Sequence, residues 1–593
     1  MAEGLLVLTY RISIDITIGI NYMFLLFGSI FLLISCHTLF GGSGQIVKPI
    51  IYPVSVEIYV SLDGKDSNNR IADFNSPLHS FDSIFSVLKS KTRELEGDIY
   101  CSVNISKGRY VLSNPIEQLE KDFIITENQK RKLHISFIGL EDSVILDGTN
   151  IKRGGGYGLI RLSGSNTQIR NIIIKNAPSF GLVIGQPFAR STNVLIDNVC
   201  IDSTYSHGLL IGNTQSLLED TVHIRNCIFT ETNQMNAGGL SKQWGSALKL
   251  FGAKHILIEN CLFEHNWSEA ISINNSNNVN IKTSRFFNNY APSVYCDIAR
   301  NITIDQNVFI AKSDSIMYKE GKRGMVAILL SNEAWDPAAV SHITSNIDIF
   351  SNVFLGQSGV LDIWEGTVSF LQTSIVENVR FAFNSTFGMS EANKSSNTSI
   401  LSTVFSTPIP FNRTIDNIFI YGNVFSVDPQ KWSTNLWFRS NSTFLQRFTF
   451  KGNRWNSAFP SMGNFILDDS RSLPDTLPSR ISEILDFKKK IPSLRECEYD
   501  NLGRERGKDS SFAGAFEFTE PLSVVQDSDP YISYIYSYFP NETCIIPKQW
   551  INTKIVCVGL KGEEIVLENT GSDSMIRLPG TGPYFLYPQK NVP

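Results

Sequence analysis

Short segments in which apolar and polar residues alternate recur along the chain, each with an apolar residue at its centre. Alternation of this kind over a few residues is typical of a half-buried β-strand. The two shortest spacings between these centres, from residue 258 to 281 and from 281 to 304, are both 23 residues. We call the central residue the anchor. The anchors are Ile169, Ile196, Ile224, Ile258, Ile281, Ile304, Ile349, Phe381, Ile420 and Phe450.

Two further positions of the repeat keep their character. Three residues after eight of the anchors stands a small or amide residue, and five residues after nine of them stands a large apolar one. The first set is Cys227, Cys261, Ser284, Asn307, Asn352, Asn384, Asn423 and Asn453. The second set is Ile174, Ile201, Phe229, Phe263, Phe286, Phe309, Phe354, Phe425 and Trp455. Segment 378–387 fits the pattern if it contains one extra residue.

This repeat predicts a stacked fold. Strands stack at about 4.8 Å, so asparagines in equivalent turns can bond to one another along the stack. A single unit cannot bury its own apolar face, and neighbouring units must stack into a solenoid. A propeller needs four antiparallel strands in each repeat, for which 23 residues are too few. We therefore expect an all-β fold, a right-handed parallel β-helix, over residues 48–520.

A second strand precedes each anchor segment from residue 207 to 365. We align it on an inward column of Ile211, Leu250, Ile273, Ile298, Leu329 and Ile363. Side chains alternate along a strand, so the residues just before these face outward. The alignment places Lys249, Ser272, Asp297 and Asp362 on this outer face, with Tyr295 two residues before Asp297. Lys249 and Asp297 would then lie about 9–10 Å apart.

These residues supply candidate chemistry for a sugar chain. A lyase needs a base and a cation that neutralises a uronate carboxylate, whereas a hydrolase needs two carboxyl groups about 5–10 Å apart. The candidate catalytic residues are Lys249, Tyr295, Asp297, His265 and Glu269. The candidate substrate-binding residues are Trp244, Trp267, Glu333, Asp362 and Trp364. For each one, a solvated side chain on the outside of a solenoid is the competing interpretation. His207 is interpreted as a turn residue.

The chain resembles the right-handed parallel β-helix repeat members of the pectin-lyase-like superfamily. The resemblance rests on IYVSLDGKDSNN (58–69), SPLHSFDSIFSVL (76–88), VNISKGRY (103–110) and FIGLEDSVILDG (137–148). It also rests on YDNLGRERGKDSSFAGAFEF (499–518), which is similar to a closing motif of bacterial β-helix proteins. The resemblance implies an N-terminal strand, a capping helix and the first coils. The signatures of polygalacturonases, pectate lyases and mannuronan epimerases are missing, so none of those activities is transferred.

The two ends of the chain differ from the repeat. Residues 16–36 are apolar and without charge, which is typical of an export signal or membrane anchor. Leu33-Ile34-Ser35-Cys36 resembles a lipobox with Cys36 as the lipidated residue. We therefore expect residues 1–47 to direct the protein out of the cytoplasm or tether it to a membrane. Residues 521–593 are expected to form a small β cap or accessory module.

The net charge of the chain limits which classes of partner it is expected to bind. The net charge of −5 argues against a nucleic-acid partner, which usually meets a basic face. Calcium is compatible with the exposed acids, but the chain has no calcium-binding loop motif and we do not predict a cofactor. The sequence favours a polysaccharide lyase or glycoside hydrolase that acts on a glycan. The alternative is a non-catalytic glycan-binding or cell-surface structural protein.

Overall fold

The computed structural model describes most of residues 54–467 and six strands nearer the C-terminus. Within 54–467 the description omits 69–71, 94, 96, 118–123, 127–128, 131–132, 142, 155–157, 163–164, 186–191, 213–221, 240–244, 312–325, 333–342, 358, 366–373, 388–398, 406–412, 427–435, 441–446, 452 and 456–464. Beyond it, 535–537, 543–545, 554–559, 564–568, 575–577 and 584–588 are described.

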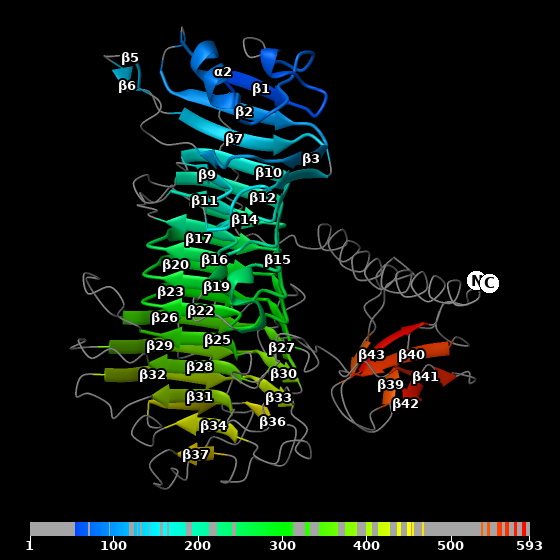
Figure 1. The fold of residues 1–593 in the computed structure, drawn as a ribbon. Coiled ribbons are helices and arrows are strands. Elements are labelled where there is room, and N and C mark those ends of the chain that lie inside the picture. Colours follow the sequence, from blue (N-terminus) through cyan, green and yellow to red (C-terminus); the bar gives the residue numbers. More distant parts are fainter. Residues whose placement is uncertain are drawn as a thin grey trace. The chain divides into compact units, whose positions relative to one another are not determined.

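The 23-stranded sheet, sheet A, contains two parallel ladders that run along the stack (Figure 1). The first ladder consists of β1 (Val56–Val60), β2 (Ile99–Ile105), β7 (Leu133–Gly139), β10 (Ser165–Lys175), β12 (Thr192–Asp202), β14 (Val222–Arg225), β17 (Lys254–Glu259), β20 (Asn277–Lys282), β23 (Arg300–Asp305), β26 (Ile343–Phe350), β29 (Ser374–Ala382), β32 (Arg413–Tyr421) and β35 (Phe448–Lys451). The second consists of β3 (Gly108–Val111), β8 (Val144–Asp147), the ends of β10 and β12, β15 (Ile228–Thr230), β18 (Leu262–Glu264), β21 (Arg285–Phe287), β24 (Val308–Ile310), β27 (Val353–Leu355), β30 (Ser385–Phe387), β33 (Val424–Ser426) and β36 (Arg454–Trp455).

The 12-stranded sheet, sheet B, is also parallel and supplies the third strand of each coil. Its strands are β4 (Ile116–Glu117), β9 (Ile160–Leu162), β11 (Leu182–Ile184), β13 (Leu209–Gly212), β16 (Ser246–Phe251), β19 (Glu269–Asn274), β22 (Val294–Asp297), β25 (Val326–Ser331), β28 (Gly359–Glu365), β31 (Ser399–Phe405), β34 (Leu436–Ser440) and β37 (Phe465–Leu467). One coil, for example, runs through β16, β17 and β18. This arrangement confirms the predicted parallel β-helix.

The anchors form one continuous column on sheet A, as predicted. The ten anchors form nine consecutive pairs in register, from Ile169 and Ile196 through to Ile420 and Phe450. Those whose exposure is described are fully buried, since they point into the space between the sheets. The column exists because a coil can bury its apolar residues only if the next coil presents apolar residues at the same height.

The predicted asparagine stack is confirmed between the two ladders. The side-chain oxygen of Asn352 accepts hydrogen bonds from the backbone nitrogen of Asn307 at 2.9 Å and from its Nδ2 at 3.1 Å. The Nδ2 of Asn307 also donates to the carbonyl of Ile281 at 2.9 Å. The same pattern continues through Asn384 and Asn423. Each turn thereby satisfies buried polar groups that would otherwise destabilise the core.

Stacked phenylalanines fill the core beside these turns. Consecutive ring centroids lie between 4.5 and 6.4 Å apart. The stack consists of Phe229, Phe263, Phe286, Phe309, Phe354, Phe381 and Phe425. Such ring pairs each contribute roughly 0.5–1.5 kcal/mol beyond the burial of their area.

One detail of the repeat was wrong. Segment 378–387 contains no extra residue, because Phe381 pairs with Ile349 and Thr386 pairs with Phe354 in unbroken register. The small Thr386 occupies the place of a phenylalanine. The ring of Phe381, from the anchor column, stacks on Phe354 and Phe425 instead and continues the aromatic stack.

A short helix covers the first coil, as the family resemblance implies. Helix α2 (Ile84–Lys91) buries Ile84, Val87 and Leu88, and it contacts β1. Two 3-10 turns, η1 (Asp66–Asn68) and η3 (Gln234–Gly239), and the hairpin of β5 (Ile124–Thr126) and β6 (Gln129–Lys130) lie in the connections. Among the described residues no helix is long and apolar enough to cross a membrane. The predicted segment 1–47, with Cys36, lies outside the described residues, as does the closing motif at 499–518.

The C-terminal strands pair in the opposite sense to those of the helix. These strands are β38 (Ile535–Ser537), β39 (Thr543–Ile545), β40 (Lys554–Gly559), β41 (Glu564–Glu568), β42 (Met575–Arg577) and β43 (Tyr584–Pro588). Strands β38, β43, β40 and β41 form an antiparallel sheet, and β39 pairs with β42. The boundaries of the predicted C-terminal module remain a prediction.

Candidate functional site

The outer face of sheet B brings together part of the predicted site, in a corrected register. Ser272 pairs with Tyr295, and Asn274 pairs with Asp297. The outward column therefore consists of Leu210, Lys249, Ser272, Tyr295, Leu329 and Asp362. The predicted inward column was wrong at two places, where Cys296 and Leu330 stand instead of Ile298 and Leu329. Ile298 has a φ of 54°, so it lies in the turn after the strand.

Lys249 is the cationic centre of this face. It lies between Leu248 and Leu250, which both pack in the core, so its side chain faces outward and is partly exposed. No hydrogen bond or ion pair links Lys249 to another residue that the structure describes. Tyr295 lies two strands away, at about 10 Å by strand spacing. The tyrosine retains 7% exposure, and Ser272 between them is buried.

Asp297 does not belong to the exposed face. Its exposure is 0%, and the Nδ2 of Asn274 donates to its Oδ2 at 3.2 Å. The Oδ1 of Asn274 in turn accepts the hydroxyl of Ser272 at 2.7 Å. The prediction that Asp297 is an exposed partner of Lys249 is therefore wrong, because the strand ends at Asp297 and the true register moves it two positions along. Asp362 stays on the outward column and is partly exposed.

A second group of contacts lies at the start of the same strands. The hydroxyl of Ser246 donates to Oε2 of Glu269 at 2.8 Å, and its backbone nitrogen donates to Nδ1 of His207 at 2.8 Å. The ring of Phe180 packs against His207 with 4.8 Å between the centroids. Burial, and next the positive charge of Lys249, lower the pKa of His207 to about 3. His207 therefore holds the start of β16 through the Ser246 backbone, a contact that the sequence interpretation missed.

The other described candidates lie elsewhere or are already engaged. Trp267 is 8% exposed, and its indole nitrogen lies 3.3 Å from Oε2 of Glu231, to which it donates. His265 follows β18 at the end of the second ladder of sheet A, with its ring against the edge of Phe287. These contacts make Trp267 a packed residue and not an open platform for a sugar ring.

Three predicted binding residues receive no side-chain description. Trp244 and Glu333 lie outside the described residues. Trp364 lies in β28, where its backbone pairs with Ser331 and Val404. In the described part of the chain, no three His, Cys, Asp or Glu side chains lie close enough to hold a metal ion.

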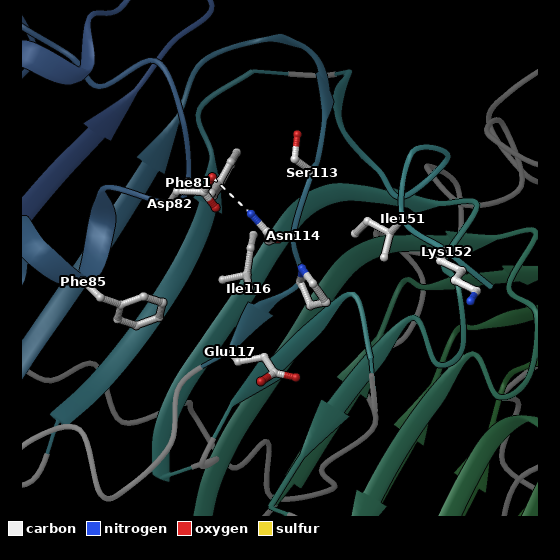
Figure 2. A pocket seen from close by; sticks show the side chains of 10 residues that line it. Phe81, Asp82, Phe85, Ser113, Asn114, Ile116, Glu117, Ile151 and Lys152 are labelled. Carbon is white, nitrogen blue, oxygen red and sulfur yellow. Dashed lines mark hydrogen bonds between the residues drawn. The ribbon is translucent and has the colours of Figure 1, made fainter. Parts of the chain in front are cut away.

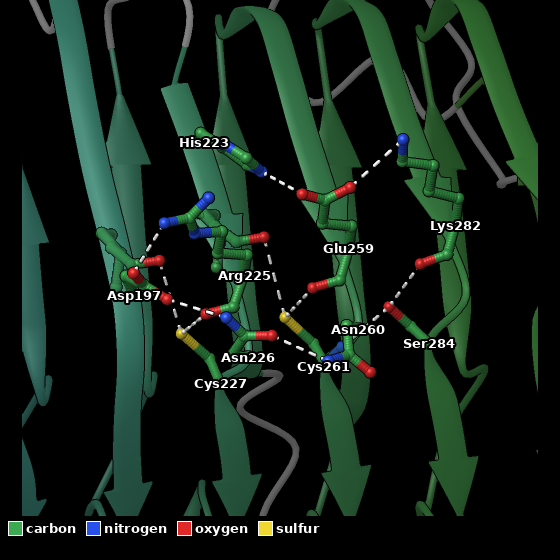
Figure 3. Close-up of polar contacts among 12 residues, drawn as sticks. Asp197, His223, Arg225, Asn226, Cys227, Glu259, Asn260, Cys261, Lys282 and Ser284 are labelled. Atoms are coloured by element: carbon green, nitrogen blue, oxygen red, sulfur yellow. Dashed lines mark hydrogen bonds and ion pairs between the residues drawn. The ribbon is translucent and has the colours of Figure 1, made fainter. Parts of the chain in front are cut away.

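The outer face of sheet A has a different arrangement of charge (Figure 3). Cations and anions alternate along one column, which we call the charge ladder: Arg170, Asp197, Arg225, Glu259, Lys282 and Asp305. Arg225 lies 2.9 Å from Asp197, and Lys282 lies 3.1 Å from Glu259. Burial opposes ionisation of Glu259, but His223 and Lys282 outweigh it and lower its pKa to about 2. Arg225 and Asn226 likewise outweigh burial and lower the pKa of Asp197.

A pocket of about 540 Å³ lies between α2 and β4 (Figure 2). Its walls combine apolar and charged side chains, including Phe81, Phe85, Ile116, Asp82, Glu117 and Lys152. Glu117 starts the outward column that leads to Lys249. Between them Val183 is 0% exposed and Leu210 is 6% exposed.

A family match supports the fold, and several solved structures are distantly similar. Residues 220–332 match the family described as right handed beta helix region. The pectate lyase Pel9A is 11% identical with a TM-score of 0.32, over 80% of this chain and 91% of that chain. A tailspike protein of Acinetobacter baumannii bacteriophage Fri1, a capsular polysaccharide depolymerase, is 9% identical with a TM-score of 0.34, over 82% of this chain and 78% of that chain. A PL6 family polysaccharide lyase from Pseudopedobacter saltans is 11% identical with a TM-score of 0.32, over 66% of this chain and 93% of that chain.

No curated protein matches the chain. The structural likenesses are too distant to transfer any residue role. The family match over residues 220–332 and the parallel pairing from β1 to β37 identify the chain as a right-handed parallel β-helix repeat protein.

Proposed function

We propose that this protein cleaves an acidic polysaccharide by β-elimination on the outer face of sheet B. The observation that supports this most is the column of Lys249, Ser272 and Tyr295, in which the lysine has no ion pair with a described residue. A cation without a counter-charge on a regular face is available to an anionic ligand. A uronate sugar has such an anionic group next to the proton that a lyase removes.

In this column, Lys249 and Tyr295 have different roles in the reaction. The Lys249 ammonium neutralises the uronate carboxylate and thereby acidifies the neighbouring C–H group. A base takes that proton, a carbon–carbon double bond forms, and the bond from carbon to the glycosidic oxygen breaks. The leaving oxygen takes up a proton. Tyr295, whose hydroxyl can accept or donate a proton, is the acid–base group that we assign.

Hydrolysis fits the same face less well. It needs two carboxyl groups on either side of the scissile bond. Asp297 is buried against Asn274, and the carboxylate of Glu269 accepts the hydroxyl of Ser246. Neither arrangement leaves a pair of open acids. Asp362 lies two strands beyond Tyr295.

A non-catalytic glycan-binding or structural role is the second candidate. The observation that favours it is the near-complete burial of Ser272 and Tyr295. A substrate could reach the tyrosine hydroxyl only if the surrounding surface opened. In this case Lys249 would hold an acidic glycan without cleaving it.

We further propose that the protein works outside the cytoplasm. The support is the uncharged apolar stretch of residues 16–36. Protease added to intact cells should degrade the full chain if it is exported, and cytoplasmic protection would contradict export. Incorporation of a labelled fatty acid that disappears in Cys36→Ser would favour the lipoprotein form.

A depolymerisation panel tests the activity. The full chain is incubated with uronate-containing and neutral polysaccharides, and ultraviolet absorbance reports the unsaturated product while a reducing-end assay reports all cleavage. We expect absorbance with uronate polymers, lost in Lys249→Ala and in Tyr295→Phe but kept in Lys254→Ala, an exposed lysine of the next strand. Reducing ends without absorbance would establish hydrolysis instead. Binding without cleavage of any polymer would favour the second candidate.

A further inference from the structure

The pocket beside α2 is formed by one edge of the capping helix and the first strand of sheet B (Figure 2). Helix α2 buries one apolar side in the core, and Phe85 at the edge of that side stays partly exposed. On β4, Ile116 is 3% exposed and packs in the core. Side chains alternate along a strand, so Glu117 faces outward, where it lines the pocket.

Asp82 and Phe85 lie on the same wall of this pocket. Ser83 between them has a φ of −83° and a ψ of −13°, so the helical turn extends back beyond the first residue of α2. Residues three apart on a helical turn share one face. Both side chains line the pocket, and Figure 2 shows both on the side that α2 provides. This wall therefore presents a carboxylate next to an aromatic ring.

Three charged side chains line the pocket, those of Asp82, Glu117 and Lys152. Within the described part of the chain, none of the three has an ion pair. The Nδ2 of Asn114 donates to Oδ2 of Asp82 at 3.5 Å, which is a long and weak contact. Arg161 pairs in register with Glu117 and offsets part of its charge, but it does not line the pocket. The pocket therefore has an excess of negative charge, to which Asp82 contributes most.

The other walls are mainly apolar, and they determine what kind of ligand fits. Besides Phe85 they consist of Phe81, Pro115, Ile116 and Ile151. Apolar walls with a few polar groups, around a volume of about 540 Å³, are typical of small-molecule sites. A positive charge is attracted both to a carboxylate and to the face of an aromatic ring. The α2 wall supplies both of these partners.

We propose that this pocket binds a small organic cation, which is an ammonium or guanidinium group on an apolar body. The charged group contacts the carboxylate of Asp82 and the ring of Phe85, and the apolar body covers Ile116 and Ile151. A free amine and the lysine or arginine side chain of a partner protein share this chemistry. The inference goes beyond the proposed cleavage on sheet B and does not depend on it.

Ligand-observed NMR on the full chain tests the charge preference with benzylamine, benzyl alcohol and benzoate. These probes share one phenyl ring and carry a positive, a neutral and a negative group. We expect benzylamine to bind about tenfold or more tightly than benzyl alcohol, because a hydrogen bond to a charged group is the stronger one. Benzoate should bind most weakly.

A second pair of probes distinguishes the two sources of the cation. Nα-acetyl-lysine amide carries the lysine side chain, and Nα-acetyl-norleucine amide is its uncharged counterpart. Binding of the lysine compound without binding of benzylamine would support the inference with a protein side chain as the ligand. Binding of benzylamine without binding of the lysine compound would support it with a free amine.

Matched variants locate the site. Asp82→Asn should weaken the binding of benzylamine by about tenfold and leave that of benzyl alcohol unchanged. Glu117→Gln should weaken it less, and Lys152→Gln should strengthen it, because a like charge is removed. Glu141→Gln changes an exposed glutamate that does not line the pocket, so it is the matched control and should have no effect.

Three outcomes would overturn the inference: no binding of either cation, equal binding of benzylamine and benzyl alcohol, or unchanged affinity for the cation in every folded acid variant. Thermal melting shows which variants are folded. Glu117→Gln lies on β4, so it keeps the test valid if Asp82→Asn destabilises α2. None of these outcomes bears on the depolymerisation assay, whose result concerns sheet B alone.

Discussion

On the outer face of sheet A, cations and anions alternate along the charge ladder, whereas on sheet B Lys249 has no ion pair with a described residue. Both faces come from the same coils and obey the same strand spacing. The cations and anions of the charge ladder pair with one another, which stabilises the stack. Little unpaired charge is therefore left to attract a ligand. Sheet B leaves the Lys249 cation without an ion pair to a described residue. The contrast is the basis for proposing sheet B, with its incomplete charge pairing, as the binding face.

Removing an anion from the charge ladder should give the largest loss of stability. Asp197→Ala leaves Arg225 and Asn226 without their acceptor in a partly buried position. We expect the free energy of unfolding to fall by about 3 kcal/mol, as for one partner removed from a buried pair. Denaturant unfolding measures this. The activity per folded molecule should be unchanged. A loss of activity in the folded fraction would contradict the claim that sheet A serves stability and sheet B serves activity.

Removing the cation from sheet B should lower activity strongly and leave stability almost unchanged. Lys249→Ala should lower the rate of glycan cleavage by about a hundredfold or more. Its melting temperature should stay within the range of ordinary surface substitutions, about 0.5 kcal/mol in stability. Initial rates and thermal melting on the same preparation measure both. A strongly destabilised Lys249→Ala variant would show that the lysine supports the fold.

The two faces should also titrate in different pH ranges. His207 has a lowered folded pKa, so protonation favours the unfolded chain and stability falls as the pH drops from 6.5 towards about 3. Glu259 also has a lowered folded pKa, so its contribution is present above pH 4.5 and is lost as the pH falls towards about 2. Each proton changes stability by about 1.4 kcal/mol per pH unit.

Variants separate these two ranges. His207→Gln should flatten the loss of stability between pH 6.5 and 4.5, and Glu259→Gln should flatten the loss below 4.5. Denaturant unfolding at a series of pH values gives both curves. An unchanged curve above pH 4.5 in His207→Gln would contradict the lowered pKa of this half-buried ring.

The smallest effect should come from an exposed pair at the far end of sheet A. Arg447 lies 3.2 Å from Asp416, with about half of each side chain exposed. Asp416→Ala should therefore cost less than about 1 kcal/mol. This variant is the matched control for Asp197→Ala, and equal losses in the two would show that burial does not set the strength of the ladder.

The sequence predicted the inner column of sheet A because its positions have one physical requirement. Every anchor must be apolar and at the same height, so ten segments could be aligned without a structure. The asparagine stack was predictable for the same reason. The pattern did not place Thr386, which is smaller than the phenylalanines at the equivalent positions. Phe381, a residue from the anchor column, fills the space that a phenylalanine would occupy there.

Sheet B was harder to align from sequence. Cys296 and Ile298 are both apolar and two residues apart, so alternation gives them the same side of the strand and does not tell which one is level with Ile273. The strand ends where Ile298 takes a positive φ, a backbone conformation that a β-branched residue rarely adopts and that sequence does not signal. His207 was missed because its role depends on Ser246, which lies on the next coil.

The most direct test of the central claim is a crystal structure of the full chain with an acidic oligosaccharide. The account predicts a sugar on the outer face of sheet B, with an anionic group at Lys249 and the chain passing towards Tyr295. A sugar bound in the pocket beside α2, or on the charge ladder of sheet A, would contradict it.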